Sequence, residues 1–101
     1  MNWITLKDSE ALSQIKEESN NAPVLIFKHS TRCSISSMAL NRLERSWEDA
    51  HMEPVKPYIL DLISYRAISN QIAEEFGIEH QSPQVIVIKN GQAIYDNSDH
   101  F

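Results

Sequence analysis

Short apolar runs separated by segments of helical spacing constrain the fold of this chain more than any other feature. Residues 24–27 form an unbroken apolar run (VLIF), a pattern typical of a strand buried on both faces. Residues 58–62 and 85–88 are two further strand candidates, and a segment with helical spacing precedes each of them. Strands that alternate with helices predict parallel, right-handed crossovers. The sequence therefore predicts an α/β fold.

Three segments have apolar residues at helical spacing. The first follows Asp8, which we interpret as an N-cap, and the third ends at Gly77, where a left-handed C-terminal cap is expected. The apolar positions are Ala11, Leu12 and Ile15 in the first helix, Ile35, Met38, Ala39, Leu43 and Trp47 in the second, and Ile68, Ile72 and Phe76 in the third.

The last two apolar runs, 85–88 and 93–95, flank a turn that contains Asn90 and Gly91, a strong hairpin signal. The predicted order is helix, strand, helix, strand, helix, strand, strand. This order predicts a single domain over residues 1–101, an α/β sandwich with a mixed four-stranded sheet flanked by helices.

Composition excludes several classes of function. No apolar run approaches the roughly 18 residues of a membrane span, and the N-terminal residues do not resemble a signal peptide. The net charge is −5, with 9 Lys and Arg scattered among 14 Asp and Glu, which disfavours binding to a phosphate backbone. We expect a cytoplasmic protein with neither nucleic-acid nor membrane partners.

Cys33 is the only cysteine, so no intramolecular disulfide can form and thiol chemistry must pass through a mixed disulfide with another molecule. It follows a buried strand and lies in the first turn of a helix, where free N–H groups and the helix dipole favour a thiolate. Ser34 and Ser36 can offer hydroxyl groups, and His29 and Arg32, with Lys28, would add positive charge if they point inward.

Each of these features also has a plainer interpretation. A lone cysteine is commonly a buried, inert side chain, although the polar segment around Cys33 favours a reactive one. Pro83 precedes a buried strand, where a cis Ser82–Pro83 bond would leave the backbone of Ser82 open to an extended peptide. An ordinary trans proline is the alternative. The four histidines lack metal-ligand spacing, so no metal site is expected.

The order of elements resembles the thioredoxin fold. The segment Cys33-Ser34-Ile35-Ser36, followed by Ser82-Pro83-Gln84, resembles the monothiol bacilliredoxins, whose motif is Thr-Cys-Pro-Ile-Ser. Cys33, Ile35 and Ser36 match this motif, whereas Arg32 and Ser34 replace its Thr and Pro. The resemblance covers essentially the whole chain.

This resemblance implies an enzyme that removes bacillithiol from oxidised, S-bacillithiolated proteins. It makes Cys33 the nucleophile, Ser36 a residue that cannot resolve the mixed disulfide, and Pro83 a cis proline beside the substrate. No bound cofactor is implied; bacillithiol is the co-substrate, with glutathione as the alternative. Thioredoxin-like domains usually end in a helix that covers one face of the sheet. We expect that C-terminal helix to be missing from the sequence, because an open apolar face favours aggregation.

Other functions remain as alternatives. A glutathione-dependent monothiol glutaredoxin would use Cys33 in the same way, but an iron–sulfur variant is disfavoured because the Cys-Gly-Phe-Ser pattern is absent. A non-enzymatic peptide-binding module would use the surface beside Pro83 and leave Cys33 dispensable. A redox sensor that responds to stress would be modified at Cys33 without turnover.

Overall fold

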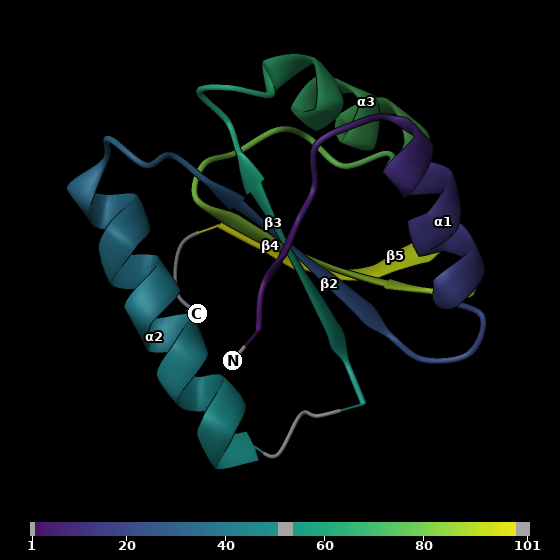
Figure 1. The fold of residues 1–101 in the computed structure, drawn as a ribbon, viewed down its shortest axis with the longest axis horizontal. Helices are drawn as coiled ribbons and strands as arrows, with labels where there is room; N and C mark the ends of the chain where they lie inside the picture. The colour runs from purple at the N-terminus through teal and green to yellow at the C-terminus, as the bar shows by residue number, and fades with distance from the viewer. Residues whose placement is uncertain (1, 51–53, 99–101) are drawn as a thin grey trace.

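The computed structural model describes residues 2–50 and 54–98, with residues 48–50 described by their backbone alone. A five-stranded sheet has α2 on one face and α1 and α3 on the other (Figure 1). The strands are β1 (Ile4–Thr5), β2 (Val24–His29), β3 (Lys56–Asp61), β4 (Gln84–Lys89) and β5 (Gln92–Asn97), and the helices are α1 (Glu10–Glu18), α2 (Ser34–Ala50) and α3 (Arg66–Phe76).

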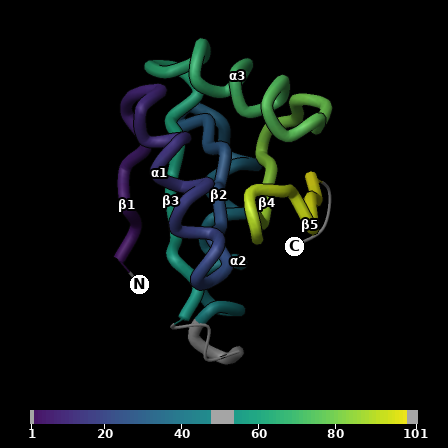
Figure 2. The backbone as a smooth tube through the Cα atoms, turned by 90° about the vertical axis from the view of Figure 1, so that its right-hand side faces the viewer, coloured from purple at the N-terminus to yellow at the C-terminus, as the bar shows by residue number. Residues whose placement is uncertain are grey.

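The strands lie side by side in the order β1, β3, β2, β4, β5 (Figure 2). The first three strands of this order are parallel, whereas β4 runs antiparallel to β2 and β5 antiparallel to β4. The mixed α/β sandwich is therefore confirmed, but the sheet has five strands instead of the predicted four. The additional strand, β1, has only two residues, too few for an alternating pattern to reveal it.

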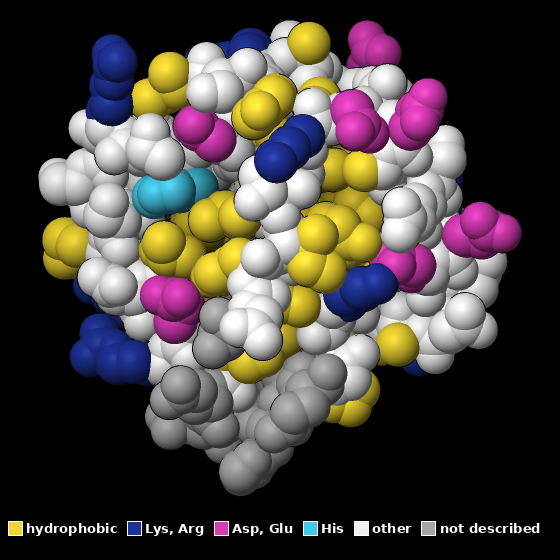
Figure 3. Space-filling view, in the orientation of Figure 1, with side chains coloured by type: hydrophobic (Ala, Val, Ile, Leu, Met, Phe, Trp, Pro, Cys, Tyr) yellow, Lys and Arg dark blue, Asp and Glu magenta, His cyan; other side chains and the backbone are white. Residues whose placement is uncertain are grey.

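The core consists of one apolar cluster on each face of the sheet. All six residues of β2 are buried, as its unbroken apolar run predicts. Side chains of β2 alternate between the two clusters: Ile26 packs beneath α1 and α3, and Phe27 packs beneath α2. From the β1 edge, hydrophobic side chains gather in the middle of the view, with most of the charged ones around them (Figure 3).

The predicted apolar face of α2 is only partly correct. Leu43 and Trp47 are buried, but Ile35 is 67% exposed and Met38 is 56% exposed. The reason is helical geometry: at about 100° per residue, a spacing of four drifts around the helix, so Ile35 lies roughly 120° from Trp47. Met38 lies roughly 180° from Trp47, while Ser36 lies within about 20° of it. The buried face thus contains Ser36, which the apolar pattern does not include.

The turn at Asn90 and Gly91 and the C-terminal cap at Gly77 are confirmed, whereas the N-cap of α1 is Ser9 instead of the predicted Asp8. Asp8 Oδ1 accepts a hydrogen bond from the Ala11 N–H at 3.0 Å at the start of α1. Gly77 ends α3 with a φ of +64°. Asn90 and Gly91 both have positive φ in the β4–β5 turn, as a two-residue hairpin requires. The described residues end at Ser98, so the expectation that a C-terminal helix is missing from the sequence concerns a part of the chain outside them.

Candidate active site

Cys33 lies between β2 and α2, at the start of the helix. Its N–H donates to the Ser30 carbonyl at 3.0 Å, and its own carbonyl accepts from the Ser37 N–H at 3.1 Å, the first intrahelical bond. The side chain is partly exposed. A partly exposed thiol at this position is open to reaction, so the structure does not support the interpretation of Cys33 as a buried, inert residue.

The hydroxyl of Ser36 is used inside the protein. Ser36 is fully buried, and its Oγ accepts from the Ser30 N–H at 3.0 Å and lies 2.6 Å from His29 Nδ1. His29 is the last residue of β2, Ser30 follows it, and Ser36 belongs to α2. These contacts therefore join the two ends of the loop that carries Cys33 and fix its conformation. Ser36 therefore acts on the backbone around the thiol.

His29 is buried. Its ring stacks on Phe27 with 5.6 Å between the centroids. Burial lowers the pKa of His29, and the Asp61 carboxylate partly opposes this shift. A lowered pKa favours the uncharged form of the imidazole.

The other predicted thiolate-stabilising side chains, Arg32 and Ser34, are both exposed. Among the described residues, no hydrogen bond reaches Cys33 Sγ. Stabilisation of the thiolate by His29, Arg32, Ser34 and Ser36 therefore stays a prediction.

Pro83 lies at the same end of the sheet as Cys33. It is buried, Ser82 is exposed, and the peptide bond between them is cis. Gln84 follows directly and pairs with Lys28 near the end of β2, a few residues before the Ser34 at which α2 begins. The register thus brings the predicted substrate-binding pair Ser82–Pro83 to the end of the sheet where α2 begins.

Lys28 lies on the other face of the sheet from His29, because successive strand residues alternate. It is fully buried, with Nζ 3.4 Å from the Ser69 carbonyl oxygen and 3.3 Å from His80 Nδ1. Burial, with repulsion from Arg66, lowers the pKa of Lys28 to about 8. The sequence patterns did not single out His80 and Ser69, although a lysine within a buried strand indicates that polar partners must surround it.

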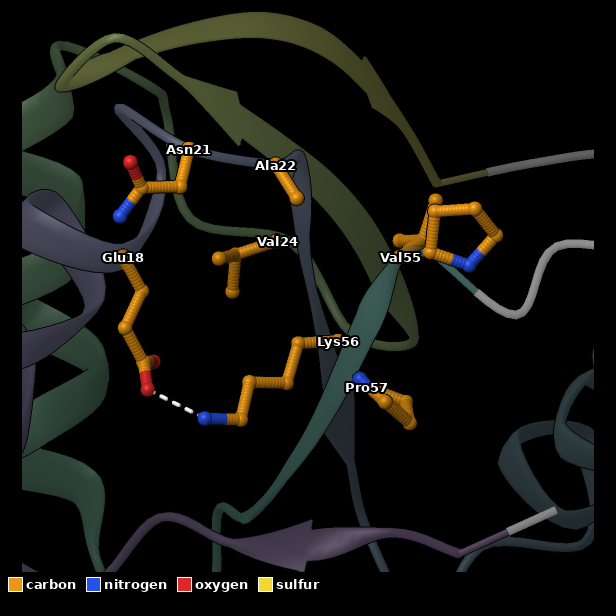
Figure 4. A pocket seen from close by; sticks show the side chains of 8 residues that line it. Glu18, Asn21, Ala22, Val24, Val55, Lys56 and Pro57 are labelled. Carbon is orange, nitrogen blue, oxygen red and sulfur yellow. Dashed lines mark hydrogen bonds and ion pairs between the residues drawn. The ribbon is translucent and has the colours of Figure 1, made fainter.

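A pocket of about 330 Å³ lies at the opposite end of the sheet (Figure 4). Glu18 of α1 forms an ion pair across it with Lys56 of β3, and the Tyr58 hydroxyl donates to Glu18 at 2.6 Å. These two bonds lower the pKa of Glu18 against the effect of burial. Burial raises the pKa of Tyr58, and the Glu18 carboxylate raises it further. None of the predicted site residues lines this pocket. Glu18 and Lys56 pair with each other, and no thiol lines the pocket.

Within residues 2–50 and 54–98, no cluster of three or more His, Cys, Asp or Glu side chains has the geometry of a metal site. In the same residues, every helix is too short or too polar to span a bilayer.

Solved structures similar to this chain share the thioredoxin fold. One, described as a proposed oxidoreductase with a thioredoxin fold, is 28% identical, with a TM-score of 0.81 over 94% of this chain and 80% of its own. Thioredoxin from Malassezia sympodialis is 22% identical, with a TM-score of 0.73 over 96% and 78%. Thioredoxin from Trypanosoma brucei brucei is 14% identical, with a TM-score of 0.74 over 95% and 77%.

The family comparison is more specific than the fold. The family model of the monothiol bacilliredoxin BrxC matches residues 4–101. This match spans both Cys33 and Pro83, and together with the oxidoreductase neighbour it supports a thiol redox function. The chain belongs to the monothiol bacilliredoxin family.

Proposed function

We propose that this protein is a monothiol thiol–disulfide oxidoreductase that removes bacillithiol from protein mixed disulfides. The observation that carries the proposal is the pairing of a partly exposed Cys33 with a fully buried Ser36 three residues later. Cys33 is accessible to a disulfide, and Ser36, which has no thiol, cannot displace a partner from a mixed disulfide on Cys33. This pairing suits a reaction in which a second small thiol completes the cycle.

The reaction has two exchange steps. In the first, the Cys33 thiolate attacks the bacillithiol sulfur of a protein mixed disulfide, a bond forms between these sulfurs, and the substrate protein leaves as a thiolate. In the second, the thiolate of a free bacillithiol attacks the bacillithiol sulfur bound to Cys33. Bacillithiol disulfide forms and Cys33 is released as a thiolate. Overall, the protein mixed disulfide and one free bacillithiol give the reduced protein cysteine and bacillithiol disulfide, so one S–S bond is broken for each one formed and the electrons balance.

The loop around Cys33 supplies the geometry for these steps. The helix start of α2 presents its N–H groups to the region of the sulfur, which favours a thiolate as attacking and leaving group. The bonds from Ser36 to Ser30 and His29 keep this helix start attached to the end of β2. Ser82 is exposed beside the buried Pro83, which leaves its backbone open to a substrate chain.

The experiment follows the mass of the intact protein during exposure to an S-bacillithiolated protein and then to free bacillithiol. Transfer of one bacillithiol to Cys33, followed by its removal, is expected for the native chain and is expected to be absent in Cys33→Ser. The double variant Cys33→Ser, Ser37→Cys is a positional control, because it moves the thiol to an exposed position one turn into the same helix. Transfer to position 37 at the native rate contradicts a special role for Cys33.

Other outcomes select the alternatives. Faster transfer and release with glutathione assigns the glutaredoxin-like role. Bacillithiolation of Cys33 that free bacillithiol does not reverse indicates a redox sensor. No adduct from either thiol, in a folded protein, leaves a non-enzymatic peptide-binding module.

A further inference from the structure

Residues 78–83 join α3 to β4, and we call them the α3–β4 segment. Ile78 is buried at one end and Pro83 at the other, whereas residues 79, 81 and 82 are exposed. Among the described residues, no backbone–backbone hydrogen bond reaches residues 79–82. Between the two buried ends, only His80 is half-buried, so its side chain is the one that can fix the middle of the segment.

The ring of His80 lies between β2 and α3. Its Nδ1 is 3.0 Å from the Ser69 hydroxyl and 3.3 Å from Lys28 Nζ, and its Nε2 is 3.2 Å from Arg66 Nη1. Lys28 belongs to β2, whereas Ser69 and Arg66 belong to α3, so one side chain ties the segment to both elements. Because Lys28 and Ser69 are fully buried, the ring is anchored to the interior of the protein.

These partners require a neutral ring in one particular tautomer. A guanidinium only donates hydrogen bonds, so Nε2 must accept from Arg66 and the ring proton must be on Nδ1. In this tautomer Nδ1 donates to the Ser69 hydroxyl, while Lys28 donates to the Ser69 carbonyl at 3.4 Å. A second proton, on Nε2, would point an N–H at Arg66 and remove the acceptor that Arg66 uses.

The charges that face the ring oppose its protonation. Lys28 faces it from β2 and Arg66 from α3. Glu79, its neighbour in the segment, is exposed, and Gln84 of β4 is uncharged. No ion pair between described residues includes Lys28 or Arg66. Burial lowers the pKa of His80, and repulsion from Lys28 and then Arg66 lowers it further. Protonation in acid therefore breaks the contacts of the ring, because it places a positive charge between two others.

The α3–β4 segment ends beside the proposed exchange site. Ser82 and Pro83 lie at the end of the sheet where α2 begins, as the register of β2 and β4 shows. Figure 1 shows the chain leave α3 and cross this end of the sheet before it enters β4. His80 is two residues before Ser82, so the conformation that His80 imposes reaches the Ser82 backbone directly. A polypeptide attached at Cys33 can extend along that backbone, whereas a small disulfide is too short to do so.

We propose that His80 is a positioning residue for protein substrates. Its neutral ring holds the α3–β4 segment in the conformation that presents the Ser82 backbone to the substrate chain, and protonation of the ring releases the segment. The inference rests on the proposed function and adds to it a residue on which substrate proteins depend and small disulfides do not. His80 touches neither sulfur, and the exchange steps are those given above, with one S–S bond formed for each one broken.

Two probes that share one disulfide and differ in chain length test this role. One is a peptide whose single cysteine carries mercaptoethanol as a mixed disulfide, and the other is N-acetylcysteine amide with the same modification. Cys33 attacks the mercaptoethanol sulfur of each probe, and the peptide or the cysteine derivative leaves as a thiolate. The measured quantity is the rate ratio, the second-order rate constant of the peptide divided by that of the small probe. The effect of pH on the Cys33 thiolate cancels in this ratio.

In the native chain, the rate ratio is expected to fall about fivefold between about pH 7.5 and about pH 5, with its midpoint at the His80 pKa measured from the ring NMR signals. No such fall is expected in His80→Gln, which cannot be protonated. At about pH 7.5, His80→Leu is expected to lower the rate ratio about fivefold, because the hydrogen bonds of the ring are lost. Asn70→Leu, at an exposed position of α3 next to Ser69, is the matched control and is expected to leave the ratio within about twofold.

A rate ratio of the native chain that does not change with pH, or the same fall in His80→Gln, overturns the proposal. The first of these measurements needs no substitution that could unfold the chain. Equal rate ratios for His80→Leu and Asn70→Leu, with both variants folded by circular dichroism, overturn it as well. Because neither probe contains bacillithiol, a failure with bacillithiol substrates alone refutes the proposed function and leaves the role of His80 standing. If neither probe reacts with Cys33, both proposals are refuted.

Discussion

Replacing Ser36 with alanine removes a buried oxygen that contacts both the Ser30 N–H and the His29 ring. The Ser30 N–H donates to Ser36 Oγ at 3.0 Å, and His29 Nδ1 lies 2.6 Å from it. Ser36 is fully buried, so water cannot replace the hydroxyl without entering the protein. Each lost hydrogen bond costs about 1 kcal/mol, and more when its partner stays buried and unsatisfied. Alanine returns up to about 0.5 kcal/mol through its higher helix propensity.

The expected net loss is therefore about 2 kcal/mol in the free energy of unfolding. For a chain of this size, such a loss lowers the melting temperature by roughly 10 °C. Urea denaturation with an unchanged slope measures the effect, and a thermal melt checks it. Ser37→Ala is the matched control, because residue 37 is exposed on the same helical turn, and its expected change is within about 0.5 kcal/mol. A stability of Ser36→Ala within about 0.5 kcal/mol of that of Ser37→Ala would show that the two bonds contribute nothing.

Three further predictions concern other parts of the fold. Ser19 is fully buried, and its Oγ accepts a hydrogen bond from the Gly91 N–H at 2.9 Å. Ser19→Ala should therefore lower the free energy of unfolding by about 1 kcal/mol and speed hydrogen exchange at the Gly91 amide. Ser13→Ala, at an exposed position of α1, is the control, and unchanged exchange at Gly91 contradicts a stabilising role for this bond. Gly77 has a φ of +64° and open space around it, so the strain of Gly77→Ala comes from the backbone conformation alone. This variant should lower the free energy of unfolding by about 1–2 kcal/mol, and Gly77→Asn by less. Equal losses for the two variants in urea denaturation argue against a backbone cause. Folding lowers the pKa of Lys28 from 10.5 to about 8, so between these pH values the folded state binds fewer protons than the unfolded state. The free energy of unfolding should therefore rise from pH 8 to about 9.5, by up to about 1.4 kcal/mol per pH unit. Lys28→Met should abolish that rise, and a rise of the same size in the variant would assign it to another group.

Much of the fold follows from patterns among residues that are close together in the sequence. The apolar run of β2, the cap at Gly77 and the turn at Asn90 and Gly91 each depend on neighbouring residues only, and each is where the pattern predicts. The position of Cys33 at the start of α2 follows in the same way, because a polar break between strand and helix is local information. The family match over residues 4–101 supports a thiol redox function, which the position of Cys33 alone does not specify.

Contacts between distant segments were beyond the reach of these patterns. The strand β1 exists because Leu6 and its neighbours meet β3, where the Leu6 N–H donates to the Ile59 carbonyl at 2.9 Å. The exposure of Ile35 and Met38 depends on which face of α2 packs against the sheet, which a count of every fourth residue does not capture.

The sequence by itself determined that this protein has one thiol, no second cysteine to resolve a mixed disulfide, and an α/β order that brings the thiol to a helix start. Tertiary structure decided what surrounds that thiol. It turned Lys28 to one face of the sheet and His29 to the other, and gave each a partner far along the chain or across the loop, His80 for the first and Ser36 for the second. The physical reason is that a strand alternates its side chains between two layers, and only the packing of those layers determines which polar groups meet in each.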